Sequence, residues 1–277
     1  MINSIIWNAN PEIFSIGALS IRWYGLLFAL GIVASYYTLQ YIFKKEKLPQ
    51  TMLDKFAIWA VVATVVGARL GHVLFYEPEY FFAHPAEILM VWHGGLASHG
   101  ATIGLILVVI IFSLKYKIPM LWLFDRMAVI VPVAAGSIRL GNLMNSEIYG
   151  HHTDLPWGFV FKNASPPETI ACHPTQLYEA LVYFTLFIAM IMWYRHKKEA
   201  IQGGLFVGVM FLVIFVARFL IEFIKNTQVD FEQGMTLNMG QILSIPFILL
   251  GLLFIFLAFK LKYIPKITIP KQFVSKP

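Results

Sequence analysis

A polar stretch at residues 139–150 contains the side chains best suited to chemistry in an otherwise apolar chain. It reads Arg-Leu-Gly-Asn-Leu-Met-Asn-Ser-Glu-Ile-Tyr-Gly, so a guanidinium, two amides and a carboxylate follow one another closely. Such groups are energetically costly in hydrocarbon and are retained there when they are paired or functional. The stretch therefore predicts either a reaction centre or a polar contact that holds helices together.

The elements around this stretch are predicted to be membrane-spanning helices. Of the 277 residues, 58% are hydrophobic and only 13% are charged, so the polar surface that a soluble core needs is missing. Seven apolar segments are each long enough to cross about 30 Å of hydrocarbon as a helix. We place them near residues 19–43, 56–76, 94–114, 118–144, 177–194, 203–224 and 237–259. We expect an all-α polytopic membrane protein that forms a single domain over residues 1–277, because no low-complexity linker divides it.

The distribution of Lys and Arg predicts the orientation of these helices. The connections after the first, third and fifth segments, together with the tail at about 260–277, hold 14 basic residues, whereas the N-terminus and the alternate connections hold only Lys162 and Lys225. Basic connections face the cytoplasm, so we expect the N-terminus outside and the C-terminus in the cytoplasm. Residues 1–18 contain no Lys or Arg, so no cleavable signal peptide is expected. Contact with anionic lipid explains the formal net charge of +6 without nucleic acid.

Polar residues within the apolar segments gather on the predicted outer side. The arginines there are Arg22, Arg69, Arg139 and Arg218, whereas Arg126 lies in the inner half beside Asp125, which indicates a structural role. Glu222 follows Arg218 by four residues and therefore shares its helix face. The other polar residues on this side are Tyr24, His99, His173, Gln176, Tyr178 and Glu179. Cations beside outer headgroups predict recognition of an anionic phosphate.

The longest external connection, residues 145–176, is expected to form a small folded cap or an arm that guides substrate. It contains His151, His152 and Asp154, but adjacent histidines without a spaced third ligand argue against a metal site. Cys172 is the one cysteine, which excludes an intramolecular disulfide and indicates an ordinary small apolar residue.

Two short sequence patterns need no functional role. Arg69-Leu70-Gly71-His72 resembles Arg139-Leu140-Gly141-Asn142, and a glutamate, Glu77 or Glu147, follows each arginine after eight residues; coincidence accounts for so short a match. The pairs Gly67 with Gly71 and Gly100 with Gly104 predict close helix packing.

Several ordered motifs resemble those of bacterial phosphatidylglycerol:prolipoprotein diacylglyceryl transferases, over about residues 17–260. Residues 139–150 resemble the signature of that family, although Ile138 stands where a glycine commonly precedes it and Ile214 where many members have a tyrosine. The supporting motifs are Arg22-Trp23-Tyr24-Gly25, Gly67-Ala68-Arg69-Leu70-Gly71, His93-Gly94-Gly95-Leu96-Ala97-Ser98-His99-Gly100, His173-Pro174-Thr175-Gln176-Leu177-Tyr178-Glu179 and Met239-Gly240-Gln241-Ile242-Leu243-Ser244.

The resemblance implies an enzyme of the bacterial cytoplasmic (inner) membrane with its active site toward the outer leaflet. Its partners would be phosphatidylglycerol, membrane lipids and prolipoproteins with a lipobox cysteine. Transfer of the diacylglyceryl group to that cysteine gives a thioether and releases glycerol 1-phosphate. The family uses no metal or organic cofactor, and the reacting thiol belongs to the substrate rather than to Cys172.

The resemblance also assigns roles to single residues. It implies that Arg139 binds phosphatidylglycerol, that Arg218 is a second essential arginine and that His99 transfers a proton. Donors at the two arginines would stabilise the leaving phosphate by about 3 kcal/mol. Asn142 and Asn145 would bind headgroup hydroxyls, and Glu222 would orient Arg218. The remaining matches are Tyr24, Glu147 and Gly150.

The residues themselves are also compatible with purely structural roles. Arg139 and Arg218 would serve equally in salt bridges between helices, His99 in a hydrogen bond between helices, and Gly150 as a turn residue with positive φ. Tyr24 suits an ordinary interfacial aromatic, and Glu147 a helix cap or ion pair. A transporter or flippase for anionic lipid, or a phosphatidylglycerol-binding protein, would also use outer arginines, although a transporter should place polar residues at the midplane and inner leaflet too.

Overall fold

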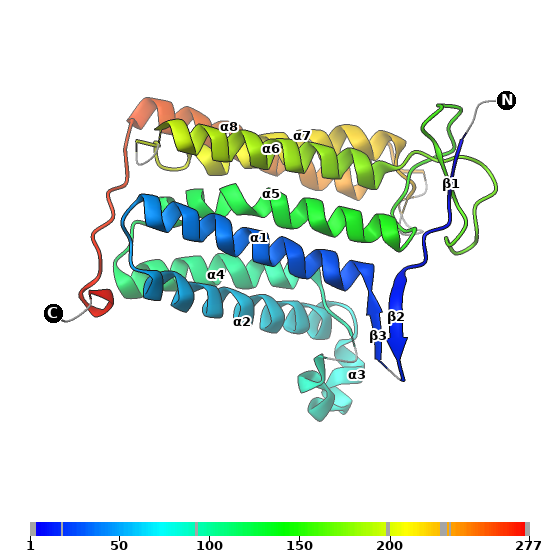
Figure 1. Ribbon diagram of the computed structural model, residues 1–277, viewed down its shortest axis with the longest axis horizontal. Coiled ribbons are helices and arrows are strands. Elements are labelled where there is room, and N and C mark those ends of the chain that lie inside the picture. Colours follow the sequence, from blue (N-terminus) through cyan, green and yellow to red (C-terminus); the bar gives the residue numbers. More distant parts are fainter. Residues whose placement is uncertain are drawn as a thin grey trace. The chain divides into compact units, whose positions relative to one another are not determined.

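Long helices dominate the computed structural model, which describes residues 4–17, 19–91, 94–197, 200–227, 232 and 234–274 (Figure 1). Seven of the helices in this part of the chain are long and apolar enough to cross a membrane. They are α1 Trp23–Lys45, α2 Gln50–Phe75, α4 Ser98–Tyr116, α5 Met120–Met144, α6 Thr175–Lys197, α7 Leu205–Ile221 and α8 Met239–Leu261. The prediction of a polytopic membrane protein with seven apolar helices is confirmed.

Three predicted helix starts were wrong, each for a local reason. The first apolar helix begins at Trp23 rather than near 19, because Leu19–Arg22 form a strand that pairs with Glu12–Ile16. The third apolar helix begins at Ser98 rather than near 94, because Gly94 and Gly95 have φ of 88° and 68°, outside the helical region. The second begins at Gln50 rather than near 56, because the polar turn after Pro49 continues the helix beyond the apolar stretch.

Short elements that the all-α prediction omitted accompany the helices. Strand β1 (Ile5–Trp7) pairs in parallel with β4 (Phe159–Phe161), and β2 (Glu12–Ile16) pairs antiparallel with β3 (Leu19–Arg22). A turn at Gly17, with φ of 60°, joins β2 to β3. The short helical elements are α3 Pro78–Ala83 and the 3₁₀ turns Pro85–Leu89, Glu222–Ile224 and Lys271–Phe273.

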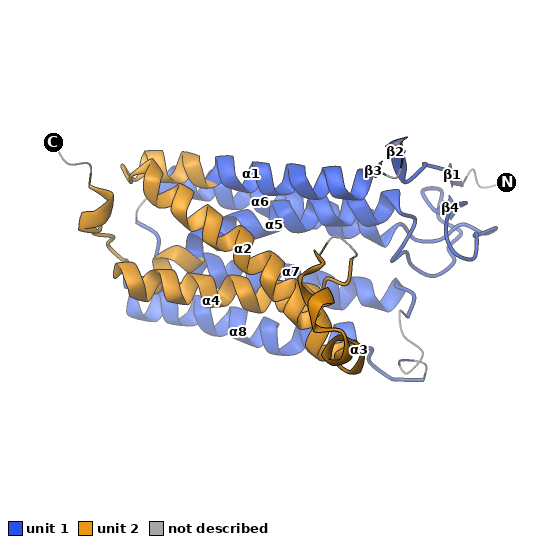
Figure 2. Cartoon of the chain, turned by 90° about the horizontal axis from the view of Figure 1, so that it is seen from below, with its two compact units in different colours: residues 1–38, 125–264 blue, residues 39–124, 265–277 orange. Residues whose placement is uncertain are grey.

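The chain divides into two compact units (Figure 2). Unit 1 comprises residues 1–38 and 125–264, and unit 2 comprises residues 39–124 and 265–277. In unit 1, α7 packs against both α6 and α8. In unit 2, α2 packs against α4.

A buried carboxylate fixes the start of α7 within unit 1. Asp125 is 0% exposed and accepts hydrogen bonds from the backbone N–H groups of Gly204 (2.8 Å), Phe206 (3.0 Å) and Val207 (3.1 Å). These N–H groups have no partner inside the helix, so the carboxylate satisfies them and complements the helix dipole. The polar pair Asp125 and Arg126 is therefore structural, as predicted.

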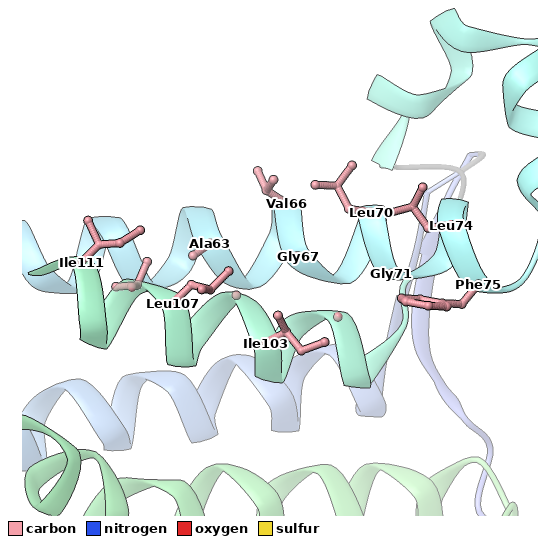
Figure 3. A pocket seen from close by; sticks show the side chains of 13 residues that line it. Ala63, Val66, Gly67, Leu70, Gly71, Leu74, Phe75, Ile103, Leu107 and Ile111 are labelled. Atoms are coloured by element: carbon pink, nitrogen blue, oxygen red, sulfur yellow. The ribbon is translucent and has the colours of Figure 1, made fainter.

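Glycines bring α2 and α4 together in unit 2. A Cβ added at Gly71 would lie 2.8 Å from the Cα of Gly100, and one added at Gly104 would overlap the carbonyl of Ala63. The predicted close packing is therefore confirmed. Beside the crossing lies an apolar groove of about 320 Å³, lined by side chains that include Leu70, Phe75 and Ile103 (Figure 3).

The connection between α5 and α6 is a folded cap with its own core. Buried Leu143, Phe159, Phe161, Ala164 and Cys172 form that core, and Trp7, Tyr149 and Leu177 pack against it. The indole N–H of Trp7 donates to the carbonyl of Leu143 at 3.0 Å and so ties the N-terminal strand to the end of α5. The connection is therefore a folded segment.

Candidate active site

Five helix ends meet in unit 1 at the predicted signature stretch. The ends of α5 and α7 and the starts of α1, α6 and α8 contribute polar side chains to one connected network. Its members are Tyr24, Arg139, Asn142, Asn145, Glu147, Gln176, Glu179, Tyr183, Arg218, Glu222, Lys225 and Asn238.

Arg139 is held by a carboxylate from the start of α6. Its Nε lies 2.8 Å from Glu179 Oε2, and Glu179 is 0% exposed. Its Nη1 donates to Asn142 Oδ1 at 3.3 Å, and the guanidinium also hydrogen bonds the Tyr183 hydroxyl. The ion pair links the end of α5 to the start of α6.

Lys225 joins the two carboxylates of the network, and sequence reasoning missed it. Its Nζ lies 3.5 Å from Glu179 Oε1 and 3.3 Å from Glu222 Oε1, and its side chain is 1% exposed. The prediction that Lys225 belongs to an external connection does not account for this burial. A signal was available, because Arg218, Glu222 and Lys225 are spaced four and three residues apart and so continue one helical face.

Arg218 and Glu222 form the predicted i,i+4 pair, with Nε and Oε1 3.6 Å apart. Asn238, which caps α8, donates from Nδ2 to Glu222 Oε2 at 3.0 Å. Gly240 permits this approach, because a Cβ there would lie 2.5 Å from the Glu222 carboxylate carbon. The chain of ion pairs thus runs from Arg139 to Arg218, and three cations share two carboxylates.

The turn after α5 folds Glu147 back onto the helix end. Ser146 and Ile148 have positive φ of 54° and 61°, which reverse the chain within a few residues. Glu147 Oε1 then accepts hydrogen bonds from Asn142 Nδ2 (2.8 Å) and Asn145 Nδ2 (3.1 Å). Asn142 therefore links Arg139 to Glu147.

Two glycines in the signature permit close approaches. A Cβ at Gly141 would lie 2.8 Å from the Tyr24 ring, so the start of α1 packs against α5 at this position. The charges of Glu147 and Arg139 act on the Tyr24 hydroxyl. The prediction that Gly150 has positive φ was wrong; glycine is needed because a Cβ there would overlap the carbonyl of Ile224.

Three buried acceptors beside Glu147 have no hydrogen-bond donor among the described residues. They are Asn145 Oδ1, Gln176 Oε1 and Ser146 Oγ. The orientation of the Gln176 amide is fixed, because its Nε2 donates to the carbonyl of Glu147 at 2.6 Å. Buried acceptors without donors are unusual and point to a polar ligand.

Two predicted members of the outer cation group have partners of their own. Arg69, in unit 2, donates from its guanidinium to the carbonyls of Glu87, Ile88, Gly94 and Gly95. Its donors are therefore engaged by the backbone of residues 87, 88, 94 and 95. Arg22 lies 3.8 Å from Glu12 in an exposed pair.

His99 is an exposed residue in the first turn of α4, in unit 2. The structure therefore places it in a different unit from Arg139 and Arg218. The motif residue His93 lies outside the described residues.

The titratable groups of the cap are shifted by burial. Burial, followed by the charge of Glu168, raises the pKa of the Cys172 thiol to about 11. Burial and the charge of His151 lower the pKa of His173. Because the thiol stays neutral at neutral pH, Cys172 is a poor nucleophile, in agreement with the prediction that it takes no part in the chemistry.

Comparison with known proteins identifies the family. The sequence profile of the prolipoprotein diacylglyceryl transferases matches residues 11–257. The chain is 44% identical over 259 residues to the phosphatidylglycerol–prolipoprotein diacylglyceryl transferase of Tolumonas auensis, covering 93% of this chain and 99% of that protein. It is 46% identical over 270 residues to the protein of that name from Porphyromonas gingivalis, covering 92% and 95%. The chain therefore belongs to the prolipoprotein diacylglyceryl transferase family.

Proposed function

We propose that this transferase moves the diacylglyceryl group of phosphatidylglycerol to the lipobox cysteine of a prolipoprotein, in the bacterial inner membrane. The whole chain acts as one domain, with the N-terminus and the cap outside and the basic tail at 260–277 in the cytoplasm. The active site then faces the outer leaflet, where the positive-inside rule puts the ends of α5 and α7.

The ion network of unit 1 carries this proposal. Arg139, Arg218 and Lys225 share Glu179 and Glu222, so the two guanidinium groups stand at the two ends of one chain of ion pairs, where they would attract a phosphodiester. Each arginine contacts its carboxylate through Nε, and the guanidinium N–H groups that remain would donate to the phosphate.

The acceptors beside Glu147 support recognition of a hydroxyl-rich headgroup. Asn145 Oδ1 and Gln176 Oε1 lack donors among the described residues, and glycerol hydroxyls would supply them. Three further residues support the shape of the site. Asn142 joins Arg139 to Glu147, and Gly150 permits the close approach of residue 224. The ring of Tyr24 packs against Gly141 in α5.

The proposed reaction is a displacement at the glyceryl carbon bound to the phosphate oxygen. His99 accepts the proton of the substrate thiol, because an imidazole nitrogen is a common general base. The thiolate forms the C–S bond, the C–O bond to phosphate breaks, and glycerol 1-phosphate leaves with the electron pair. Arg139 and Arg218 stabilise the negative charge of this leaving group.

The test is an assay of the purified protein with phosphatidylglycerol and a lipobox peptide, with the thioether detected by mass spectrometry. We expect product from the wild type and a large loss from Arg139→Lys, which keeps the charge but removes the planar fork. Lipid that is bound or moved across the bilayer without thioether formation would overturn the proposal. Undiminished turnover of His99→Gln at every pH would remove His99 from the mechanism.

A further inference from the structure

We propose that the cap binds one divalent transition-metal ion of the zinc class through His152, Glu168 and Cys172. The imidazole nitrogen, a carboxylate oxygen and the sulfur lie within 4.8 Å of one another. This structural site is independent of the transferase reaction and of its active-site residues.

Backbone pairing brings the histidine and the cysteine face to face. His152 and Cys172 are partners in an antiparallel bridge, flanked by hydrogen bonds from Thr153 N to Ala171 O (2.8 Å) and from His173 N to His151 O (3.0 Å). Such a non-hydrogen-bonded pair places its two side chains close together on one face. The ligands thus belong to a fixed backbone frame.

Glu168 reaches the same face from the segment before Cys172. Its backbone N–H donates to the carbonyl of Phe161 at 3.0 Å, and its Oε2 lies 3.4 Å from His152 Nε2. Ligand atoms around a tetrahedral zinc ion are about 3.5 Å apart, so this pair already has suitable spacing. The other two pairs lie within 4.8 Å, so each must close by no more than about 1 Å for an ion to bind.

The donor set selects the class of ion. One nitrogen, one oxygen and one sulfur suit zinc and similar borderline ions, whereas magnesium and calcium prefer oxygen ligands alone. The ion displaces the thiol proton of Cys172 to solvent, and the resulting thiolate and the Glu168 carboxylate together balance its two charges. His152 is 59% exposed at its side chain, so water can occupy a fourth position.

A second residue orients the carboxylate. The hydroxyl of Tyr149 donates to Glu168 Oε1 at 2.7 Å, which directs Oε2 toward His152. Tyr149 is itself stacked on Phe161, with ring centroids 4.8 Å apart. Outer contacts of this kind commonly change metal affinity by about 10- to 100-fold.

Metal titration of the purified full chain, after removal of bound metal by a chelator, tests the site. We expect Zn²⁺ to bind one ion per chain and to raise the thermal unfolding midpoint. Co²⁺ should produce a thiolate-to-cobalt charge-transfer band in the near ultraviolet. Cys172→Ser should abolish that band, His152→Gln should weaken binding at least about tenfold, and Tyr149→Phe should weaken it about 10-fold or more.

The neighbouring His151→Gln is the matched control, because His151 stands beside His152 but is not a member of the cluster. Its binding should equal that of the wild type. The absence of stoichiometric binding, or unchanged affinity in both Cys172→Ser and His152→Gln, would overturn the site. His152→Gln alters an exposed side chain and so keeps the test valid if Cys172→Ser does not fold. Thioether formation, measured on the same samples, reports separately on the transferase proposal.

Discussion

The same three residues, Arg-Leu-Gly, occur near the end of α2 (residues 69–71) and near the end of α5 (residues 139–141). The arginine makes different contacts in each. Arg69 in α2 donates to four backbone carbonyls, those of residues 87, 88, 94 and 95. Arg139 in α5 pairs with the Glu179 carboxylate and belongs to a chain of five charged groups. The partner atoms, rather than the motif, decide whether an arginine is a structural anchor or part of a binding site.

The two stretches nevertheless share a local geometry. The fourth residue of each meets the glutamate five positions later: His72 Nε2 lies 3.8 Å from Glu77 Oε2, and Asn142 Nδ2 lies 2.8 Å from Glu147 Oε1. Both helices end within this interval. The helix ends themselves differ, because Tyr76 after α2 has right-handed helical dihedrals whereas Ser146 and Ile148 after α5 have positive φ.

The largest expected difference is in the rate of thioether formation after replacement of each arginine. Arg139→Lys should lower thioether formation about 100-fold, because the ammonium cannot reproduce the donor fork at the phosphate. Arg69→Lys, measured in the same assay, should change turnover far less in folded protein. A turnover of Arg139→Lys close to that of the wild type would break the distinction.

For stability we expect the opposite order, with a larger effect from replacing Arg69 than from replacing Arg139. Arg69→Met removes the donor of four partly buried hydrogen bonds, and we expect the free energy of unfolding to fall by about 3 kcal/mol. Denaturant unfolding in detergent provides the measurement, and binding of phosphatidylglycerol to the folded fraction should be unchanged. Unaltered stability combined with lost lipid binding would place Arg69 in the phosphate site after all.

The glycine two residues after each arginine provides a second comparison, with a smaller expected effect. Gly71→Ala presses a methyl group on the Gly100 backbone and should destabilise the protein by about 2 kcal/mol, as overpacking does. Gly141→Ala presses on the Tyr24 ring, a side chain that can move, so stability should fall less while turnover drops several-fold. Thermal unfolding and thioether assays of the two variants side by side would show whether the effects separate in this way.

The smallest effect on stability and turnover is expected from replacement of Glu77. Glu77→Gln removes an exposed partner of His72, and such surface pairs contribute no more than about 1 kcal/mol. Glu147→Gln removes the acceptor shared by Asn142 and Asn145 and should lower turnover more. Equal turnover losses in the two variants would contradict a special role for the second stretch.

The sequence was sufficient where the signal was local. Apolar length predicted the seven helices, and the four-residue spacing predicted the contact of Arg218 with Glu222. Family motifs directed attention to Arg139. The helices and the Arg218–Glu222 contact depend on periodicity within one segment, which a single sequence displays directly, whereas the choice of Arg139 came from the resemblance to a family.

Features that join distant segments were not predictable in this way. The charge of Lys225 alone predicts a place in a connection, although the side chain is buried between carboxylates of α6 and the end of α7. The contact of His152 with Glu168 and Cys172 depends on pairing across the cap, and adjacent histidines gave no indication of it. Gly150 needed a neighbour, the carbonyl of Ile224, that lies far along the chain.

The cap that Asp125 places on α7 also bears on how the chain is made. Its three backbone donors lie 79, 81 and 82 residues further along, so they are synthesised long after the carboxylate. Before α7 is synthesised, the Asp125 carboxylate of α5 lacks these three donors. Lateral association of α5 with the start of α7 is therefore a late step of biogenesis, and a chain truncated before residue 204 should be a substrate for membrane quality control.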